Sequence, residues 1–101
     1  MENIYTIEEI KEIVSPIFEQ NNVKKAILFG SYAKNSAVEE SDIDIYIDSE
    51  GFLNGFNFFG VYGAVEEKLN KKLDLIEAIE VIKDSRIYNE IHEQGVVIYG
   101  Q

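Results

Sequence analysis

The sequence predicts an α/β (α+β) fold, in which a small mixed β-sheet is flanked by helices. One observation leads to this class, and a second to the number of domains. Segments with helical apolar spacing alternate with short strand-like segments, in the order α-β-α-β-α-β-α-β. The 101 residues, 46% of them apolar, are enough for one modest core, so we expect a single domain over residues 1–101.

The first predicted element is a helix that begins after Thr6. Thr6 and Glu9 have the spacing of a capping box, in which each side chain accepts a hydrogen bond from the other residue's backbone. An apolar stripe at helical spacing continues to Phe18, so one face of the helix should pack on the core. Pro16 lies within this stripe, which predicts one kinked helix rather than two. Asn21–Asn22 is a suitable left-handed end.

Two strands and the turn between them form the most informative part of the chain. Residues 23–29 end in four consecutive apolar residues, as expected of a strand that is covered on both faces. Gly30 and Ser31 then turn the chain into a predicted short helix over residues 32–34. Residues 42–48 alternate isoleucine with polar side chains, which predicts a second strand with one buried face.

A segment rich in glycine and phenylalanine, residues 51–60, follows as a predicted loop. Phe58 and Phe59 are expected in the core. Phe52 and Phe56 are equally consistent with a partner or dimer surface and with burial under the sheet. The remaining predicted elements are a helix over about 58–70, a strand over 73–77, a short helix capped by Ser85 or Asp84, and a strand over 96–99.

Three aspartates carry the predicted chemistry. Residues two apart in a strand point to the same face and lie roughly 6.5–7 Å apart, so Asp42 and Asp44 should project together, opposite the isoleucine face. Their oxygens are the ligands that hard divalent cations prefer. Asp74 lies between two leucines in a predicted strand, where solvation alone explains an acid poorly, and is the best candidate for a third ligand. His92, the only histidine, is expected to be a surface or satisfied residue rather than a catalytic base.

Gly30 and Ser31 predict a phosphate-binding turn. Glycine lets the backbone approach phosphate oxygens closely, and the N-terminus of the following helix would offer free N–H groups. Gly-Ser alone is typical of an ordinary strand-to-helix turn, but here Asp42-Ile43-Asp44 follows after ten residues. The combination suits the transfer of a nucleotide from a magnesium-bound nucleoside triphosphate.

Composition and charge exclude several other classes. No apolar run approaches the roughly 20 residues that a membrane span needs. The net charge of −10 argues against nucleic acid as a partner, because binding phosphates needs clustered lysine and arginine. A basic protein partner fits this charge better. The absence of cysteine is consistent with a cytoplasmic protein.

The Gly-Ser pair with Asp-x-Asp ten residues later resembles the signature of the DNA-polymerase-β-like nucleotidyltransferase superfamily. The short chain and the run Phe-Gly-Ser-Tyr-Ala-Lys at residues 29–34 are similar to its minimal nucleotidyltransferase branch. The resemblance implies the fold of that superfamily. It also implies that Asp42, Asp44 and Asp74 are catalytic and hold two Mg²⁺ ions, with Asp74 orienting or deprotonating the acceptor hydroxyl.

The same resemblance implies that Gly30 and Ser31 hold the β and γ phosphates of ATP and that Lys34 belongs to the nucleotide-binding site. Members of the family usually carry Arg-Gly where this chain has Lys34-Asn35. Lysine keeps the charge but lacks the fork with which arginine binds phosphate. If this chain differs from the family, we expect the difference in its affinity for the triphosphate or in its rate of transfer, and not in the carboxylate site.

Minimal nucleotidyltransferases are commonly paired with a helical HEPN-domain toxin. The resemblance implies that this chain is the antitoxin of such a pair and transfers AMP from ATP to a hydroxyl group of the toxin, expected to be a tyrosine. Two other hypotheses stay open. The chain could be a non-catalytic antitoxin that masks its partner, or a homo-oligomer that modifies a small molecule.

Overall fold

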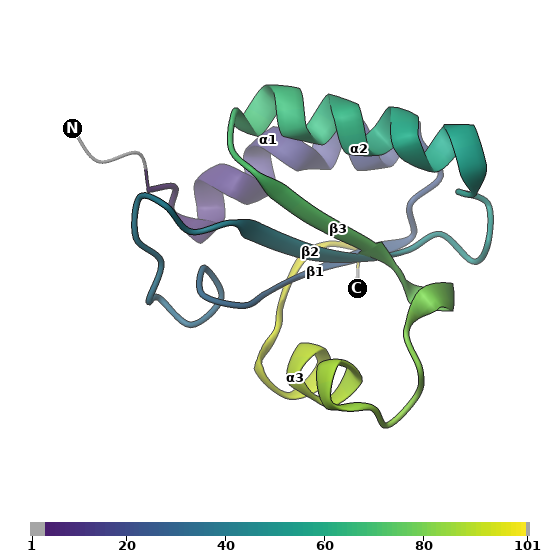
Figure 1. Cartoon of the computed structure of the whole chain (residues 1–101). Helices are drawn as coiled ribbons and strands as arrows, with labels where there is room; N and C mark the ends of the chain where they lie inside the picture. Colours follow the sequence, from purple (N-terminus) through teal and green to yellow (C-terminus); the bar gives the residue numbers. More distant parts are fainter. Residues whose placement is uncertain (1–3, 101) are drawn as a thin grey trace.

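The computed structural model describes residues 4–100 and contains the predicted alternation of helices and strands (Figure 1). Its elements are α1 (Ile7–Gln20), β1 (Lys25–Phe29), β2 (Ile43–Asp48), α2 (Gly55–Leu69), β3 (Leu73–Glu77), the 3₁₀ helix η1 (Ala78–Glu80), α3 (Arg86–Gln94) and β4 (Val96–Tyr99). The predicted class, a small mixed sheet flanked by helices, is confirmed. Among residues 4–100, no helix has both the length and the apolar character needed to cross a membrane.

The four strands form one sheet in the order β3-β2-β1-β4. β1 pairs antiparallel with β2 and with β4, whereas β2 pairs parallel with β3. A parallel pair needs a crossover connection, and α2 supplies it. α1 and α2 lie together on one face of the sheet, and α3 lies on the opposite face (Figure 1).

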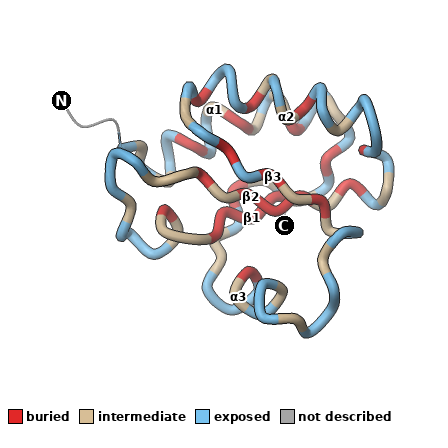
Figure 2. The backbone as a smooth tube through the Cα atoms, viewed as in Figure 1, coloured by how far each residue is buried: buried red, intermediate tan, exposed pale blue. Residues whose placement is uncertain are grey.

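The sheet has an apolar core on each face, and buried segments follow the strands and the inner sides of α1 and α2 (Figure 2). The larger core, under α1 and α2, contains the three isoleucines of β2: Ile43, Ile45 and Ile47. The smaller core, on the α3 side, consists of Ile27, Phe29, Tyr46 and Ile91. The polar side of β2 therefore faces the side of the sheet that carries α3.

Helix α1 begins and ends as the sequence predicts. Oγ1 of Thr6 accepts a hydrogen bond from the Glu9 N–H at 3.0 Å, and Oε1 of Glu9 accepts one from the Thr6 N–H at 2.8 Å. Pro16 lies within one continuous helix. Asn22 follows the helix with a φ of 62°, in the left-handed region that asparagine tolerates better than most residues.

The predicted short helix over residues 32–34 is wrong. Residues 31–35 form a turn instead, in which the Lys34 N–H bonds to the carbonyl of Gly30 and the Ser36 N–H reaches back to the carbonyl of Ser31. That last bond spans five residues, and Asn35 has a φ of 57°, so the helical pattern cannot continue.

Other boundaries also differ from the prediction. β1 begins at Lys25 rather than at residue 23, and β2 begins at Ile43, so Asp42 lies just before the strand. Ser85 rather than Asp84 caps α3, because its Oγ accepts the Tyr88 N–H at 3.2 Å. The sequence analysis did not predict η1.

The predicted loop over residues 51–60 is largely helical, because α2 begins at Gly55. Phe58 packs against the larger core as predicted, but Phe59 is 69% exposed. Consecutive residues of a helix point about 100° apart, so only one of the two can join Val61 and Val65 on the buried face. The expectation that Phe59 lies in the core is therefore wrong.

Candidate active site

Asp44 and Asp74 lie side by side in the sheet. They are Cα partners in the parallel pairing of β2 with β3. Directly paired residues point to the same face of a sheet, and Tyr46, two residues beyond Asp44, packs in the core on the α3 side. Both carboxylates therefore project from the face that carries α3, with Asp44 partly buried and Asp74 exposed.

Asp42 belongs to the same group of acids, although it precedes β2. The pKa of Asp44 is raised from 3.8 to about 6, first by burial and then by the negative charges of Asp74, Asp42 and Glu90. Carboxylates this close together repel one another unless a cation lies between them. The structure thus places Asp44 beside Asp74, and the charges of Asp42 and Glu90 also act on Asp44. The sequence analysis did not indicate Glu90.

The turn after β1 contacts this group directly. Gly30 has a φ of 74°, and a Cβ atom at this residue would lie 2.1 Å from Oδ2 of Asp44. Phe29, the residue before it, pairs with Asp44 in the antiparallel ladder of β1 and β2. Glycine suits residue 30 best, because L residues rarely adopt this φ and a Cβ atom would force the Asp44 carboxylate to move.

The turn over residues 31–35 offers hydrogen-bond donors to an anion. Within residues 4–100, the backbone N–H groups of Ser31 and Tyr32 and the hydroxyl of Ser31 donate no hydrogen bond. The next two N–H groups, of Ala33 and Lys34, bond to the carbonyl of Gly30 at 3.2 and 3.3 Å. Successive free N–H groups in a turn form a concavity that suits phosphate. These donors belong to a turn and not to the predicted helix N-terminus.

Lys34 lies close to the acids but is paired with one of them. Its Nζ is 3.8 Å from Oε2 of Glu90 in α3, and both side chains are partly exposed. Asn35 occupies the position where the family usually has glycine, and its φ of 57° is in the left-handed region. Asparagine therefore meets the backbone requirement that glycine would otherwise meet.

Helix α3 contributes Glu90, which the sequence analysis missed. Besides Glu90, it carries Tyr88 and His92, whose rings lie 4.3 Å apart, and His92 also contacts the ring of Tyr46 at 5.6 Å. His92 is exposed, as expected. The apolar spacing of this helix indicates that the helix packs on the sheet. The spacing does not indicate which face of the sheet the helix covers, so Glu90 could not be assigned to the site.

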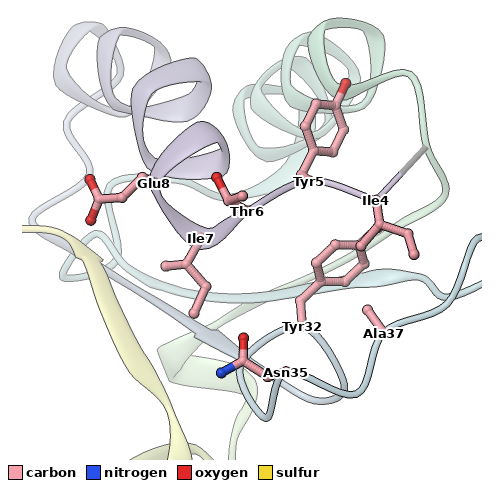
Figure 3. Close-up of a pocket in the computed structure, with 8 residues that line it drawn as sticks. All are labelled: Ile4, Tyr5, Thr6, Ile7, Glu8, Tyr32, Asn35 and Ala37. Atoms are coloured by element: carbon pink, nitrogen blue, oxygen red, sulfur yellow. The ribbon is translucent and has the colours of Figure 1, made fainter. Parts of the chain in front are cut away.

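A hollow of about 330 Å³ lies behind the turn and is lined by residues 4–8 together with Tyr32, Asn35 and Ala37. Figure 3 shows Tyr32 and Asn35 rising from the turn toward the start of α1. The hydroxyl of Tyr32 is buried and has no hydrogen-bond partner in the described part of the chain. None of the four acids lines this hollow, so it lies apart from the aspartate group.

The aspartates are suitable ligands for a divalent cation, although their side chains are not arranged around a common point. Among residues 4–100, no three histidine, cysteine, aspartate or glutamate side chains are close enough to form a metal-binding group. The pKa of Asp44 is nevertheless raised first by burial and then by the charges of the neighbouring acids, and a bound cation would relieve that repulsion. Asp42, Asp44 and Asp74 are all oxygen ligands, which suits Mg²⁺.

The sequence is similar to that of known nucleotidyltransferases. The model of the family described as "Polymerase beta, Nucleotidyltransferase" matches residues 8–101. MJ0435 of Methanocaldococcus jannaschii, whose name marks it as a candidate protein adenylyltransferase, is 36% identical over 86 residues, which are 83% of this chain and 92% of that protein. Protein adenylyltransferase MntA of Thermococcus cleftensis is 32% identical over 75 residues, which are 70% of this chain and 76% of that protein.

Solved structures share the fold. A crystal structure described as a toxin–antitoxin with AMP-PNP has a TM-score of 0.76 at 20% identity, over 90% of this chain and 73% of the other. A structure of a tri-AMPylated Shewanella oneidensis HEPN toxin in complex with its MNT antitoxin has a TM-score of 0.71 at 18% identity, over 95% of this chain and 74% of the other. At these identities the likeness establishes the fold alone.

Proposed function

This chain belongs to the polymerase β nucleotidyltransferase family, and we propose that it transfers AMP from ATP to a hydroxyl group of a partner protein. The observation that best supports this activity is the contact of the Gly30 turn with the Asp44–Asp74 pair. Backbone donors that suit phosphate lie there beside carboxylates that suit divalent cations. The names of both relatives refer to protein adenylyl transfer.

In this proposal the N–H groups of Ser31 and Tyr32 bind the β and γ phosphates, and the Ser31 hydroxyl adds a third donor. Lys34 leaves Glu90 and neutralises part of the phosphate charge. Asp74, the exposed member of the aspartate pair, orients the acceptor hydroxyl and takes its proton. The acceptor oxygen forms a bond to the α-phosphorus, the bond to the β-phosphate breaks, and pyrophosphate leaves with the electron pair.

Asp42, Asp44 and Asp74 would hold two Mg²⁺ ions, which supply charge neutralisation for the triphosphate and the transition state. The chain itself supplies the position of these carboxylates. Asp44 is partly buried and fixed against Gly30, whereas Asp74 is exposed. We therefore expect Asp44 to be the ligand that the fold holds most firmly and whose replacement is most damaging.

We further propose that the chain is a cytoplasmic antitoxin and that the acceptor is a tyrosine of a helical HEPN-domain toxin. Support comes from two solved structures with this fold, which are described as toxin–antitoxin complexes, one of them with an AMPylated HEPN toxin. The net charge of −10 adds support for a partner with a basic surface.

The test is the intact mass of a HEPN-domain protein encoded next to the gene for this chain, after incubation with the chain and Mg-ATP. The wild type should add one or more AMP units, and Asp44→Asn should add none. Asp84→Asn is the matched control, because Asp84 is exposed and does not contribute to the shifted pKa of Asp44. A stable complex without any mass gain would contradict AMP transfer.

A non-catalytic antitoxin that masks its partner is the second candidate. The contact of Lys34 with Glu90 favours it, because the lysine expected to bind nucleotide is engaged by an acid. Excess EDTA separates the two functions: AMP transfer needs the metal, so EDTA should block neutralisation of the toxin, whereas masking should be unaffected.

A further inference from the structure

Four large apolar side chains that do not belong to the aspartate group are exposed. They form what we call the phenylalanine patch: Phe52, Phe56, Phe59 and Ile79. Phe56 is 94% exposed and Ile79 is 73% exposed. The patch spans the region where the loop after β2, the first turns of α2 and η1 come together, at the right-hand edge of Figure 1. Phe59 and Ile79 line one hollow, Phe56 lies one helical turn before Phe59, and Phe52 lies in the loop before α2. Adjoining exposed apolar side chains are typical of a contact surface.

The patch is hollowed between α2 and η1. A hollow of about 320 Å³ is lined from one side by Phe58 and Phe59 of α2 and from the other by Ile79 of η1, with Leu75 and Ile76 of β3 at its base. β3 is an edge strand of the sheet. The hollow therefore opens along the edge of the sheet, where an apolar side chain of another molecule can enter.

A buried hydrogen-bond network holds this region in place. Oγ of Ser49 donates to Oε2 of Glu77 at 2.5 Å and accepts the Leu53 N–H at 3.0 Å. Oε1 of Glu77 accepts the Ile79 N–H at 3.4 Å. Glu77 is almost fully buried. One side chain thus ties the loop before α2 to η1, so the patch needs little ordering when a partner binds.

The rim of the patch is acidic. Glu80 lines the hollow, and an adjoining hollow of about 280 Å³ is lined by Asp48 and Glu50 as well as Glu77. Neither hollow is lined by lysine, arginine or histidine. Within residues 4–100, Glu50 alone of these acids forms an ion pair, with Lys24 at 3.0 Å.

This charge decides between two kinds of occupant. A second copy of the chain would bring the same acids, and two net charges of −10, against each other. A partner with lysine or arginine around an apolar side chain would instead match both the rim and the hollow. The charge therefore favours a basic partner over self-association.

We propose that the phenylalanine patch is the docking surface for the acceptor protein, and that the docked segment presents an apolar side chain flanked by lysine or arginine. That the docked protein is also the acceptor of AMP rests on the proposed function. Asp74 and Glu77 lie three residues apart on β3, roughly 10 Å along the strand. A protein docked on this edge of the sheet is therefore within reach of the aspartates.

Calorimetric titration with a HEPN-domain protein encoded next to the gene for this chain tests the surface. Phe56→Ser with Phe59→Ser should weaken binding at least tenfold, that is by about 1.4 kcal/mol, and Glu80→Lys should weaken it and reduce its salt dependence. Circular dichroism checks that the variants fold, as the exposure of both phenylalanines predicts. Val97→Ser is the control, because Val97 is an exposed apolar residue of β4 at the opposite edge of the sheet.

The rate of AMP transfer separates docking from chemistry. The double phenylalanine variant should raise the KM for the acceptor, whereas Asp44→Asn should abolish kcat and keep the Kd. A Kd unchanged by the phenylalanine and Glu80 variants overturns the docking surface, even where AMP transfer occurs. Patch-dependent binding without AMP transfer supports the docking surface and overturns the proposed function.

Two other outcomes also decide the proposal. Sedimentation of the chain alone should show a monomer, and a dimer that the double phenylalanine variant dissociates would assign the patch to self-association and overturn the proposal. Failure of the wild-type chain to bind the HEPN-domain protein would overturn both the docking surface and the proposed partner.

Discussion

Oδ2 of Asp44 lies in the space that a side chain at residue 30 would need, since a Cβ atom on Gly30 would be only 2.1 Å away. Phe29, just before the glycine, pairs with Asp44 across the two antiparallel strands. The turn after β1 and the Asp44 carboxylate are therefore packed directly against each other. A change in either should alter both.

Gly30→Ala is expected to reduce AMP transfer by ~100-fold, because a shift of about 1 Å at a reacting group can have that effect. It should also lower the free energy of unfolding by about 1–2 kcal/mol, since alanine is strained at a φ of 74°. AMP incorporation and urea denaturation measure the two effects.

Gly63→Ala in α2 is the matched control for Gly30→Ala. A Cβ atom at Gly63 would meet nothing within 4 Å. This variant should keep its activity and gain about 0.5–1 kcal/mol in the free energy of unfolding, because alanine is the better helix former. Full activity in Gly30→Ala would show that the contact with Asp44 is not needed.

The raised pKa of Asp44 predicts how folding depends on pH in the absence of metal. Burial, followed by the charges of Asp74, Asp42 and Glu90, raises this pKa from 3.8 to about 6. The folded state then binds the proton more tightly than the unfolded state. The resulting stabilisation is complete at pH values below the unfolded pKa and is lost as the pH rises through 6.

Asp44→Asn removes this titration. Without metal, the variant should exceed the wild type at pH 7 by about 1–2 kcal/mol in the free energy of unfolding, after allowance for solvent screening. Near pH 4 the difference should disappear. Urea denaturation in EDTA across this pH range is the measurement. A variant no more stable than the wild type at pH 7 would mean that the ionised Asp44 carboxylate does not destabilise the folded state.

The alternation in β2 explains why much of the fold and candidate site could be predicted. Isoleucines at every second position allow one orientation of the strand, with Ile43, Ile45 and Ile47 in the core and Asp44 on the other face. The capping box at Thr6 is equally local. Both features depend on neighbouring residues alone, which a sequence displays directly.

Features that depend on tertiary packing could not be predicted in the same way. Glu90 reaches the aspartates only because α3 packs on the polar face of the sheet, and an apolar stripe does not specify a face. Phe59 is exposed because consecutive residues of a helix point about 100° apart, and the packing of α2 turns Phe58, Val61 and Val65 toward the core.

A divalent cation should stabilise the folded chain. Mg²⁺ that binds only the folded state adds about 2.7 kcal/mol to the free energy of unfolding when its concentration is 100 times the Kd. Asp44→Asn and Asp74→Asn should each reduce this gain, and Asp48→Asn should retain it. Urea denaturation at neutral pH, with and without Mg²⁺, is the measurement. An equal gain in the wild type and both site variants would place the cation elsewhere.

The hollow behind the turn predicts opposite effects for two tyrosines that line it (Figure 3). The buried hydroxyl of Tyr32 has no partner among residues 4–100, so Tyr32→Phe should raise the free energy of unfolding by about 1 kcal/mol. The hydroxyl of Tyr5 donates to the carbonyl of Leu69 at 2.7 Å, so Tyr5→Phe should lower it by a similar amount. Urea denaturation of the pair checks both signs, and destabilisation by Tyr32→Phe would imply a partner for that hydroxyl.

The contact of Lys34 with Glu90 predicts how the proposed nucleotide site can be strengthened. Lys34→Arg supplies two donors in a fork that matches phosphate, and Glu90→Gln removes the acid that lies 3.8 Å from the lysine. Each change should lower the KM for ATP several-fold. Lys68→Arg, on the exposed side of α2, is the control for the added guanidinium. If neither site variant changes the KM for ATP, Lys34 does not contact the triphosphate, and the turn binds it through backbone N–H groups and Ser31 alone.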